Sequence, residues 1–152
     1  MTEVVLLGCV GPIHEPMERY SELVRDTLAG ADIRFAQVER TYSERGMLRS
    51  HGGAHGRLHP RMASVLTDCG FNVVSVAGNH AMDWGAEALL DTIKLLRAKG
   101  IQTIGAGRNL AEARQPATIA DGMRPRKSGS HRTPLNRDES TPPRQLKAAR
   151  RG

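Results

Sequence analysis

The stretch NVVSVAGNHAMDWG, residues 72–85, sets the fold class of this chain. Its first five residues are mostly apolar and β-branched, which predicts a buried strand over residues 72–76. A glycine-containing turn follows, and then leucine and isoleucine side chains recur at helical spacing over residues 84–99, up to Gly100. A buried strand that leads directly into an amphipathic helix is the unit from which parallel sheets are built.

The same alternation of strand and helix extends along the chain in both directions. Further strands are predicted over residues 3–7, 33–38 and 101–104, and further helices over residues 16–29, 60–69 and 110–113. In the helix over residues 16–29, the positions at helical spacing are Met17, Tyr20, Leu23, Val24 and Leu28. The order predicts an α/β fold with a mostly parallel sheet, covered on both faces because its strands are continuously apolar.

The C-terminal part of the chain has a different composition. Residues 121–152 hold nine Lys and Arg against three Asp and Glu, so they account for the net charge of +6 of the 152-residue chain. They also hold four of the eight prolines and show no periodicity, which predicts a disordered basic tail after a folded domain at residues 1–120. The folded part is neutral, so we expect no nucleic acid partner for it.

The sequence also predicts where the protein works. No stretch is long and apolar enough to span a membrane, and no basic leader precedes the first apolar run. Cys9 and Cys69 are expected to be reduced thiols, although two cysteines leave a single disulfide open. These features predict a cytoplasmic protein.

The loop after residues 72–76 is the strongest candidate for a functional site. It carries Asn79, His80 and Asp83 at the carboxyl end of a parallel strand, where ligands bind in α/β sheets. An amide oxygen, an imidazole and a carboxylate suit a divalent metal such as Mn, Fe or Zn. The alternative is structural, with Asp83 as the N-cap of the next helix and His80 as a polar loop residue.

The ends of the first two strands offer further candidates. Cys9 follows the first strand and is interpreted as a soft metal ligand, a nucleophile or a small buried apolar residue. Glu39 follows the second strand and shares one side of the extended chain with Gln37. Glu39 is therefore expected either at the same sheet edge as Asn79 or on the surface.

Two weaker patterns complete the candidates. His51, His55 and His59 are spaced by four in a glycine-rich segment, which is either a loop that contacts an anionic substrate or a solvated loop. Residues 105–110, GAGRNL, match G-x-G-x-x-G only in part, because Leu110 stands at the third small position. They predict a turn and a helix start, with nucleotide or phosphate binding as the alternative.

Four segments together resemble a known family. LGCVG at residues 7–11, ADIRFAQVE at 31–39, VAGNHAMDWG at 76–85 and GIQTIGAGRNLAEARQP at 100–116 are similar, in this order, to motifs of the CapA family. That family is associated with the synthesis of poly-gamma-glutamate or polysaccharide capsules and belongs to the calcineurin-like metallophosphatase superfamily. The resemblance covers residues 3–119 and implies the N-terminal half of an α/β sandwich with a metal centre at its strand ends.

The resemblance also implies roles for the candidate residues. It places Glu39 and Asn79 among the metal ligands, His80 as a ligand or an acid near the scissile group, and Asp83 as the residue that orients His80. Cys9 stands at a position where the family carries an aspartate ligand. A divalent metal, Mn, Fe or Zn, would then activate water for attack on a phosphorylated or other anionic substrate.

Departures from the family pattern lead to a further expectation. Cys9 and Gln37 replace an aspartate and an asparagine, and the family's later His-Trp-Gly and Gly-His-His motifs are not found. The tail resembles translation in a wrong frame or read-through of a truncated gene. We therefore expect weak metal binding, no catalytic activity, and self-association through an uncovered part of the sheet. A non-catalytic interaction fragment is the alternative.

Overall fold

The computed structural model describes residues 1–50 and 56–119. The expected disorder of residues 121–152, and the candidates His51 and His55, lie outside this part of the chain. The elements, in chain order, are β1 (Val4–Val10), α1 (Glu18–Ser21), α2 (Arg25–Ala29), β2 (Ile33–Val38), the 3-10 helix η1 (Pro60–Ala63), α3 (Ser64–Asp68), β3 (Val73–Ser75), α4 (Gly85–Ala98), β4 (Gln102–Ile104) and α5 (Leu110–Ala113).

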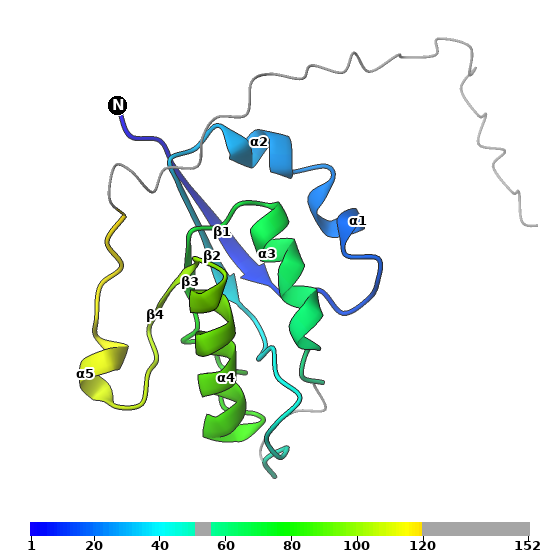
Figure 1. Cartoon of the computed structure of the whole chain (residues 1–152), viewed down its shortest axis with the longest axis vertical. Coiled ribbons are helices and arrows are strands. Elements are labelled where there is room, and N and C mark those ends of the chain that lie inside the picture. Colours follow the sequence, from blue (N-terminus) through cyan, green and yellow to red (C-terminus); the bar gives the residue numbers. More distant parts are fainter. Residues whose placement is uncertain (51–55, 120–152) are drawn as a thin grey trace, which may run out of the picture.

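The four strands form one parallel sheet in the order β1-β2-β3-β4, which confirms the predicted α/β fold. Each strand lies beside the one before it, so right-handed crossovers bring the connecting helices to the same face of the sheet. Figure 1 shows α3 and α4 together on one side of the strands. The other face carries Val4 and Leu6 of β1, and Leu6 is 72% exposed. Among the described residues, the expected cover on both faces is therefore wrong for β1, whereas Val73 of β3, on the same face as Leu6, is buried.

The core lies between the sheet and helices α3 and α4. Ala36 of β2 and Val74 of β3 are fully buried there, and so are Leu66 of α3 and Leu96 of α4. Apolar residues at helical spacing in residues 60–69 and 84–99 belong to the same core: Met62, Val65, Leu66, Cys69, Leu89, Ile93 and Leu96, with Leu90 partly buried against it. Among the described residues, no helix combines the length and the hydropathy needed to cross a membrane.

Two sequence predictions differ from the structure. The first strand continues to Val10 and is an edge strand, because β2 is its only neighbour in the described sheet. The single helix expected over residues 16–29 is two short helices, α1 and α2, separated by a turn at residues 22–24. That turn changes the helical phase, so Leu28 is buried while Leu23 is 85% exposed.

A buried arginine connects the sheet to two helix ends. Arg34 lies on the core-facing side of β2, and its Nε donates to the Gly70 carbonyl oxygen at 2.6 Å. Its Nη1 donates to the Leu28 carbonyl oxygen at 3.1 Å. Burial lowers the pKa of Arg34 from its ordinary value. The guanidinium thus supplies a donor to the Gly70 carbonyl oxygen after α3 and a further donor to the Leu28 carbonyl oxygen of α2, which also accepts from the Ala31 N–H at 3.1 Å.

Candidate functional site

The candidate site lies where β1, β2 and β3 end. Cys9 of β1 pairs in register with Gln37 of β2, and the Glu39 backbone N–H donates to the Val10 carbonyl oxygen at 3.1 Å. The turn after β3 is held by the Ala81 N–H, which donates to the Gly78 carbonyl oxygen at 3.1 Å. The carboxyl ends of three parallel strands therefore converge at one edge, as the sequence predicted.

Three of the predicted residues meet at this edge. His80 Nδ1 lies 2.8 Å from Asp83 Oδ2, and His80 Nε2 lies 3.7 Å from Glu39 Oε1. The side chains are mostly buried, with exposed fractions of 17% for His80, 26% for Glu39 and 11% for Asp83. The sequence predicted this juxtaposition, and the roles assigned to the three residues stay predictions.

The arrangement of His80 is suited to holding a cation. A carboxylate at Nδ1 favours the tautomer that carries its proton on Nδ1, as in metal-binding histidines whose second nitrogen is held by a carboxylate. Nε2 then presents a lone pair toward the Glu39 carboxylate, which is also an acceptor. Two such acceptors 3.7 Å apart could both act as ligands to one cation placed between them.

Cys9 lies beside Glu39 and is exposed to solvent. A hydrogen bond to the Glu39 carboxylate is the main cause that raises the pKa of the Cys9 thiol, and desolvation and the charge of Glu39 act in the same direction. The interpretation of Cys9 as a small buried apolar residue is therefore wrong. Cys69 is buried, and both cysteines are free, so they form no disulfide.

The donors present fit a metal ion only in part. Typical zinc–nitrogen and zinc–oxygen distances are about 2.0–2.2 Å, so a pair of donors 3.7 Å apart can share one ion. However, within residues 1–50 and 56–119 no group of three His, Cys, Asp or Glu side chains is placed to hold one. Asn79 is exposed in the turn. The described residues thus offer Glu39 and His80 as a two-donor site, with Asp83 in support.

Sequence reasoning missed the packing of Arg49 and Arg57 against the His80 loop. The Arg49 N–H donates to the Asp83 carbonyl oxygen at 2.8 Å, and the Arg57 guanidinium stacks 4.5 Å from the centre of the Trp84 ring. Arg57 Nη1 also donates to the carbonyl oxygens of Arg45 and Gly46. These contacts hold the turn that carries Asp83 in place. One hint of this packing was present in the sequence, namely Trp84, a large aromatic residue directly after the candidate carboxylate Asp83.

His59 does not join the site. Its Nδ1 accepts a hydrogen bond from the Arg61 N–H at 3.1 Å, which makes it the N-cap of η1. Its Nε2 lies 3.3 Å from Glu44 Oε1 on the surface. His59 is the member of the His51, His55 and His59 series that the structure describes, and its role is structural.

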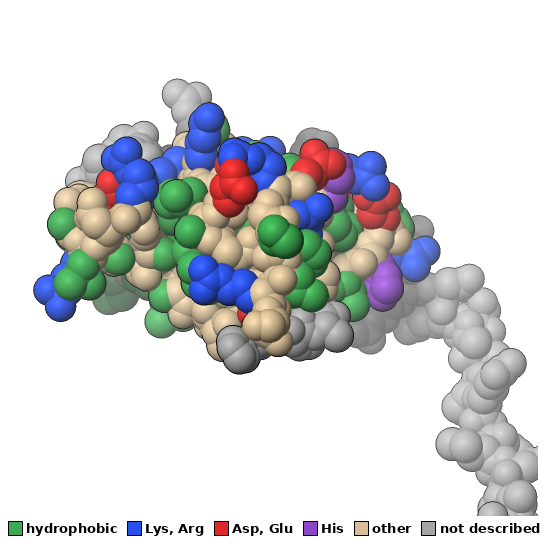
Figure 2. Space-filling view, turned by 90° about the horizontal axis from the view of Figure 1, so that it is seen from below, with side chains coloured by type: hydrophobic (Ala, Val, Ile, Leu, Met, Phe, Trp, Pro, Cys, Tyr) green, Lys and Arg blue, Asp and Glu red, His purple; other side chains and the backbone are tan. Residues whose placement is uncertain are grey.

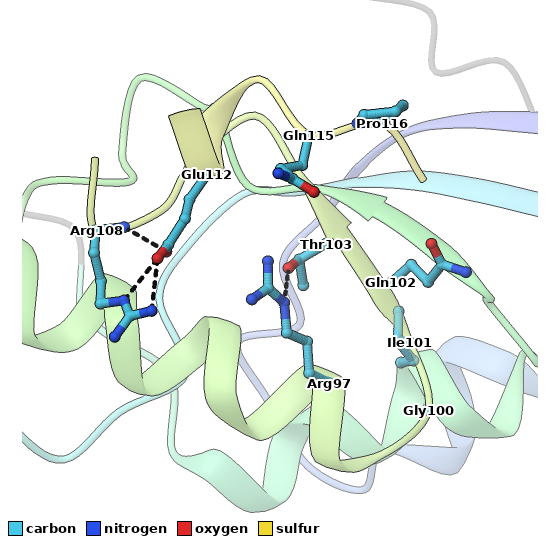
Figure 3. Close-up of a pocket in the computed structure, with 9 residues that line it drawn as sticks. All are labelled: Arg97, Gly100, Ile101, Gln102, Thr103, Arg108, Glu112, Gln115 and Pro116. Atoms are coloured by element: carbon cyan, nitrogen blue, oxygen red, sulfur yellow. Dashed lines mark hydrogen bonds and ion pairs between the residues drawn. The ribbon is translucent and has the colours of Figure 1, made fainter. Parts of the chain in front are cut away.

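The glycine-rich turn after β4 is occupied by the chain's own carboxylate. Glu112 Oε2 accepts from the Arg108 backbone N–H at 3.0 Å, and its other oxygen pairs with the Arg108 guanidinium (Figure 3). These hydrogen bonds lower the pKa of Glu112. The Asn109 side chain accepts from the Glu112 N–H and caps α5. Because Glu112 already fills the position of an anion at this turn, the contacts disfavour the nucleotide-binding alternative.

A cavity of about 570 Å³ lies beside this turn. Arg97 and Thr103 line it, and the Arg97 Nε donates to the Thr103 Oγ1 at 2.9 Å (Figure 3). It shares no lining residue with the Glu39 and His80 site. In the view of Figure 2, acidic, basic and histidine side chains are interspersed and form no surface of one sign.

The two cysteines should differ in reactivity. We expect one thiol, Cys9, to react with a disulfide reagent in the folded protein and two to react after unfolding, because Cys69 is buried. Replacing Glu39 by glutamine should speed the reaction near neutral pH, since it removes the charge that raises the Cys9 pKa and so increases the thiolate fraction. Stopped-flow absorbance with and without denaturant measures both rates. An unchanged rate in Glu39→Gln would show that the two side chains do not interact.

Comparison with known proteins adds an independent finding. The family model described as bacterial capsule synthesis protein PGA_cap matches residues 13–145. A "Probable polyglutamine synthesis accessory protein" of Mycobacterium tuberculosis is 33% identical over 91 residues, which cover 60% of this chain and 24% of that protein.

Two Bacillus relatives point in the same direction. The "PGA biosynthesis protein CapA" of Bacillus subtilis is 27% identical over 128 residues, 74% of this chain and 33% of the relative. The "Capsule biosynthesis protein CapA" of Bacillus anthracis is 36% identical over 50 residues, 33% of this chain and 12% of the relative. The chain thus matches between about an eighth and a third of the length of these relatives.

Proposed function

This chain belongs to the family of bacterial capsule synthesis proteins, and we propose that it carries a partial metal-dependent, phosphoesterase-like site at Glu39 and His80. The family and the relatives named CapA support a role related to capsule biosynthesis. The observation that carries the proposal is the arrangement in which Asp83 holds one nitrogen of His80 and Glu39 faces the other. The cytoplasmic location stays a prediction.

In this proposal each residue has a distinct task. Glu39 and the Nε2 of His80 would hold a divalent metal, with Mn, Fe or Zn as candidates. The Asp83 carboxylate accepts a hydrogen bond from the Nδ1–H of His80 and keeps the imidazole ring oriented. A bound metal supplies Lewis acidity toward water and toward the oxygens of an anionic or phosphorylated substrate. Asn79 lies exposed in the same turn, where it can contact such a substrate or the ion.

The same site is proposed to be inactive in this chain. Two donors among the described residues leave an ion poorly positioned, and misplacement near 1 Å costs about a hundredfold in rate. Cys9 presents a thiol, whose pKa Glu39 raises, where a hard carboxylate ligand is expected from the family resemblance. We expect that Cys9→Asp alone does not restore activity, because it adds at most one donor.

A metal titration tests the proposed site. We expect weak binding of Zn²⁺ or Mn²⁺ by the full chain in calorimetry, no detectable binding in His80→Ala, and binding weakened by about 10–100-fold in Asp83→Asn. His59→Ala removes a histidine from the exposed pair with Glu44 and serves as the matched control that should bind like the parent. Equal loss in His59→Ala and His80→Ala would show that binding is not specific to the strand-end site.

An assay with generic phosphomonoester and phosphodiester substrates, supplemented with the same metals, tests the proposed inactivity. We expect no turnover above background in the parent chain. Turnover that disappears in His80→Ala would show that the described donors suffice for catalysis. Metal binding without turnover would support the partial site, and absence of both would favour the alternative of a non-catalytic interaction fragment.

A further inference from the structure

The cavity beside β4 presents an arginine whose terminal donors are unused. Arg97 is an exposed residue near the C-terminal end of α4, and its Nε donates to the Thr103 Oγ1 at 2.9 Å. A guanidinium carries five N–H donors, and this bond uses one of them. In the part of the chain that the structure describes, the two Nη groups of Arg97 form no hydrogen bond or ion pair. Their four N–H donors therefore stay available to a ligand.

The bond to Thr103 also determines where these donors lie. Thr103 of β4 is 7% exposed, so its hydroxyl is an acceptor fixed on the cavity wall. Figure 3 shows the guanidinium of Arg97 next to Thr103, with its Nη groups on the side that faces Arg108 and Glu112. A guanidinium already held at its Nε loses less conformational freedom when it binds a ligand, which favours affinity.

The charge on the cavity wall favours an anion. Two arginines and one glutamate, Arg97, Arg108 and Glu112, are the charged residues among its lining, so the lining has a net charge of +1. Arg108 and Glu112 form an ion pair with each other. Arg97 has no such carboxylate partner among the described residues. The charge that is not neutralised within the cavity is therefore that of Arg97.

The size and the remaining lining of the cavity suit a small molecule. Its volume of about 570 Å³ lies in the range of about 300–1,000 Å³ that is usual for small-molecule sites. The side-chain amide of Gln115 adds polar groups to the wall, and Ile101 and Pro116 add apolar surface. Such a lining can contact the body of a ligand whose anionic group lies at Arg97.

We propose that this cavity binds a small molecule through a carboxylate or phosphate group, which pairs with both Nη groups of Arg97. The planar guanidinium matches two oxygens of either group, so the pairing is bidentate. Gln115 provides hydrogen-bonding groups for the rest of the molecule. The site is separate from Glu39 and His80 and requires no metal ion.

An NMR titration of the full 152-residue chain, labelled with nitrogen-15 and without added metal, tests the proposal. Sodium phosphate and sodium succinate are the probes, and sodium chloride at equal ionic strength is the salt control. We expect saturable shifts of the backbone amides of Ile101, Thr103 and Gln115 with at least one probe and none with chloride. Saturation by both probes indicates recognition of any oxyanion, whereas saturation by one identifies the preferred group as phosphate or carboxylate.

Three variants assign the binding to Arg97. Arg97→Gln should weaken it by about 10–100-fold, because charge-assisted hydrogen bonds are lost. Arg97→Lys keeps the charge without the planar fork and should also bind more weakly than the parent. The matched control is Arg114→Gln, which removes an exposed arginine that does not line the cavity and should bind like the parent.

Four results would overturn the proposal. The first is the absence of saturable shifts with both probes. The second is equal weakening in Arg97→Gln and Arg114→Gln, which indicates general attraction by positive charge. The third is loss of binding in His80→Ala, which assigns the anion to the strand-end site. The fourth is parental affinity in Arg97→Lys that is folded by circular dichroism, because a bidentate pairing cannot survive that change. The last variant also serves if Arg97→Gln does not fold.

Discussion

Gly46→Ala is expected to lower the free energy of unfolding by about 2–5 kcal/mol. Gly46 has φ of +92°, and a Cβ at this position would lie 2.2 Å from the Trp84 carbonyl oxygen. The left-handed conformation costs a residue with a side chain about 1–2 kcal/mol. Shifting the backbone to avoid the clash costs about 1–3 kcal/mol more, because a backbone atom cannot rotate out of the way as the end of a flexible side chain can. Urea unfolding followed by circular dichroism measures the change.

Gly100→Ala is the matched control for that substitution. Gly100 has a similar φ of +79°, and a Cβ at this position would have no other atom within 4 Å. We expect only the conformational cost of about 1–2 kcal/mol there. Equal losses in the two variants would contradict the close approach of Gly46 to Trp84. Since Trp84 follows Asp83 directly, Gly46→Ala should also weaken metal binding at His80, whereas Gly100→Ala should not.

Leu66→Ala is expected to cost about 2–5 kcal/mol of stability, the second large effect. Leu66 is completely buried in α3 against the sheet, so its truncation leaves a cavity in the core. Leu23→Ala makes the same chemical change at a position that is 85% exposed, and it should change stability by no more than about 0.5 kcal/mol. Midpoints of urea unfolding compare the two variants.

This pair of variants also tests the break between α1 and α2. The spacing of apolar residues over 16–29 predicts Leu23 on the inner face of a single helix. In the structure the turn between α1 and α2 exposes it. If Leu23→Ala lowered the stability as much as Leu66→Ala, that result would contradict this turn and favour the continuous helix.

Much of the strand-end site was predictable from sequence. Glu39, His80 and Asp83 follow strands whose apolar runs are short and clearly bounded, and parallel strands bring their carboxyl ends to one edge. The neighbours that support the site were not predictable. The contacts of Arg49 and Arg57 with the His80 turn join residues more than 25 positions apart, and no local pattern encodes which loop lies over which.

Local patterns were enough to specify the strands, the long helix α4 and the parallel α/β class, because the strands are short, mostly apolar runs and α4 shows its helical period within a few residues. Which strand is central and which is an edge depends instead on tertiary contacts. β1 is as apolar as a buried strand, and its exposure follows from the order β1-β2-β3-β4, a non-local property. Likewise, Arg34 is a charged residue and would be expected on the surface. It is buried because carbonyl oxygens at two helix ends accept hydrogen bonds from its guanidinium. Local periodicity reports which face of an element is apolar, whereas burial depends on what the rest of the chain places against that face.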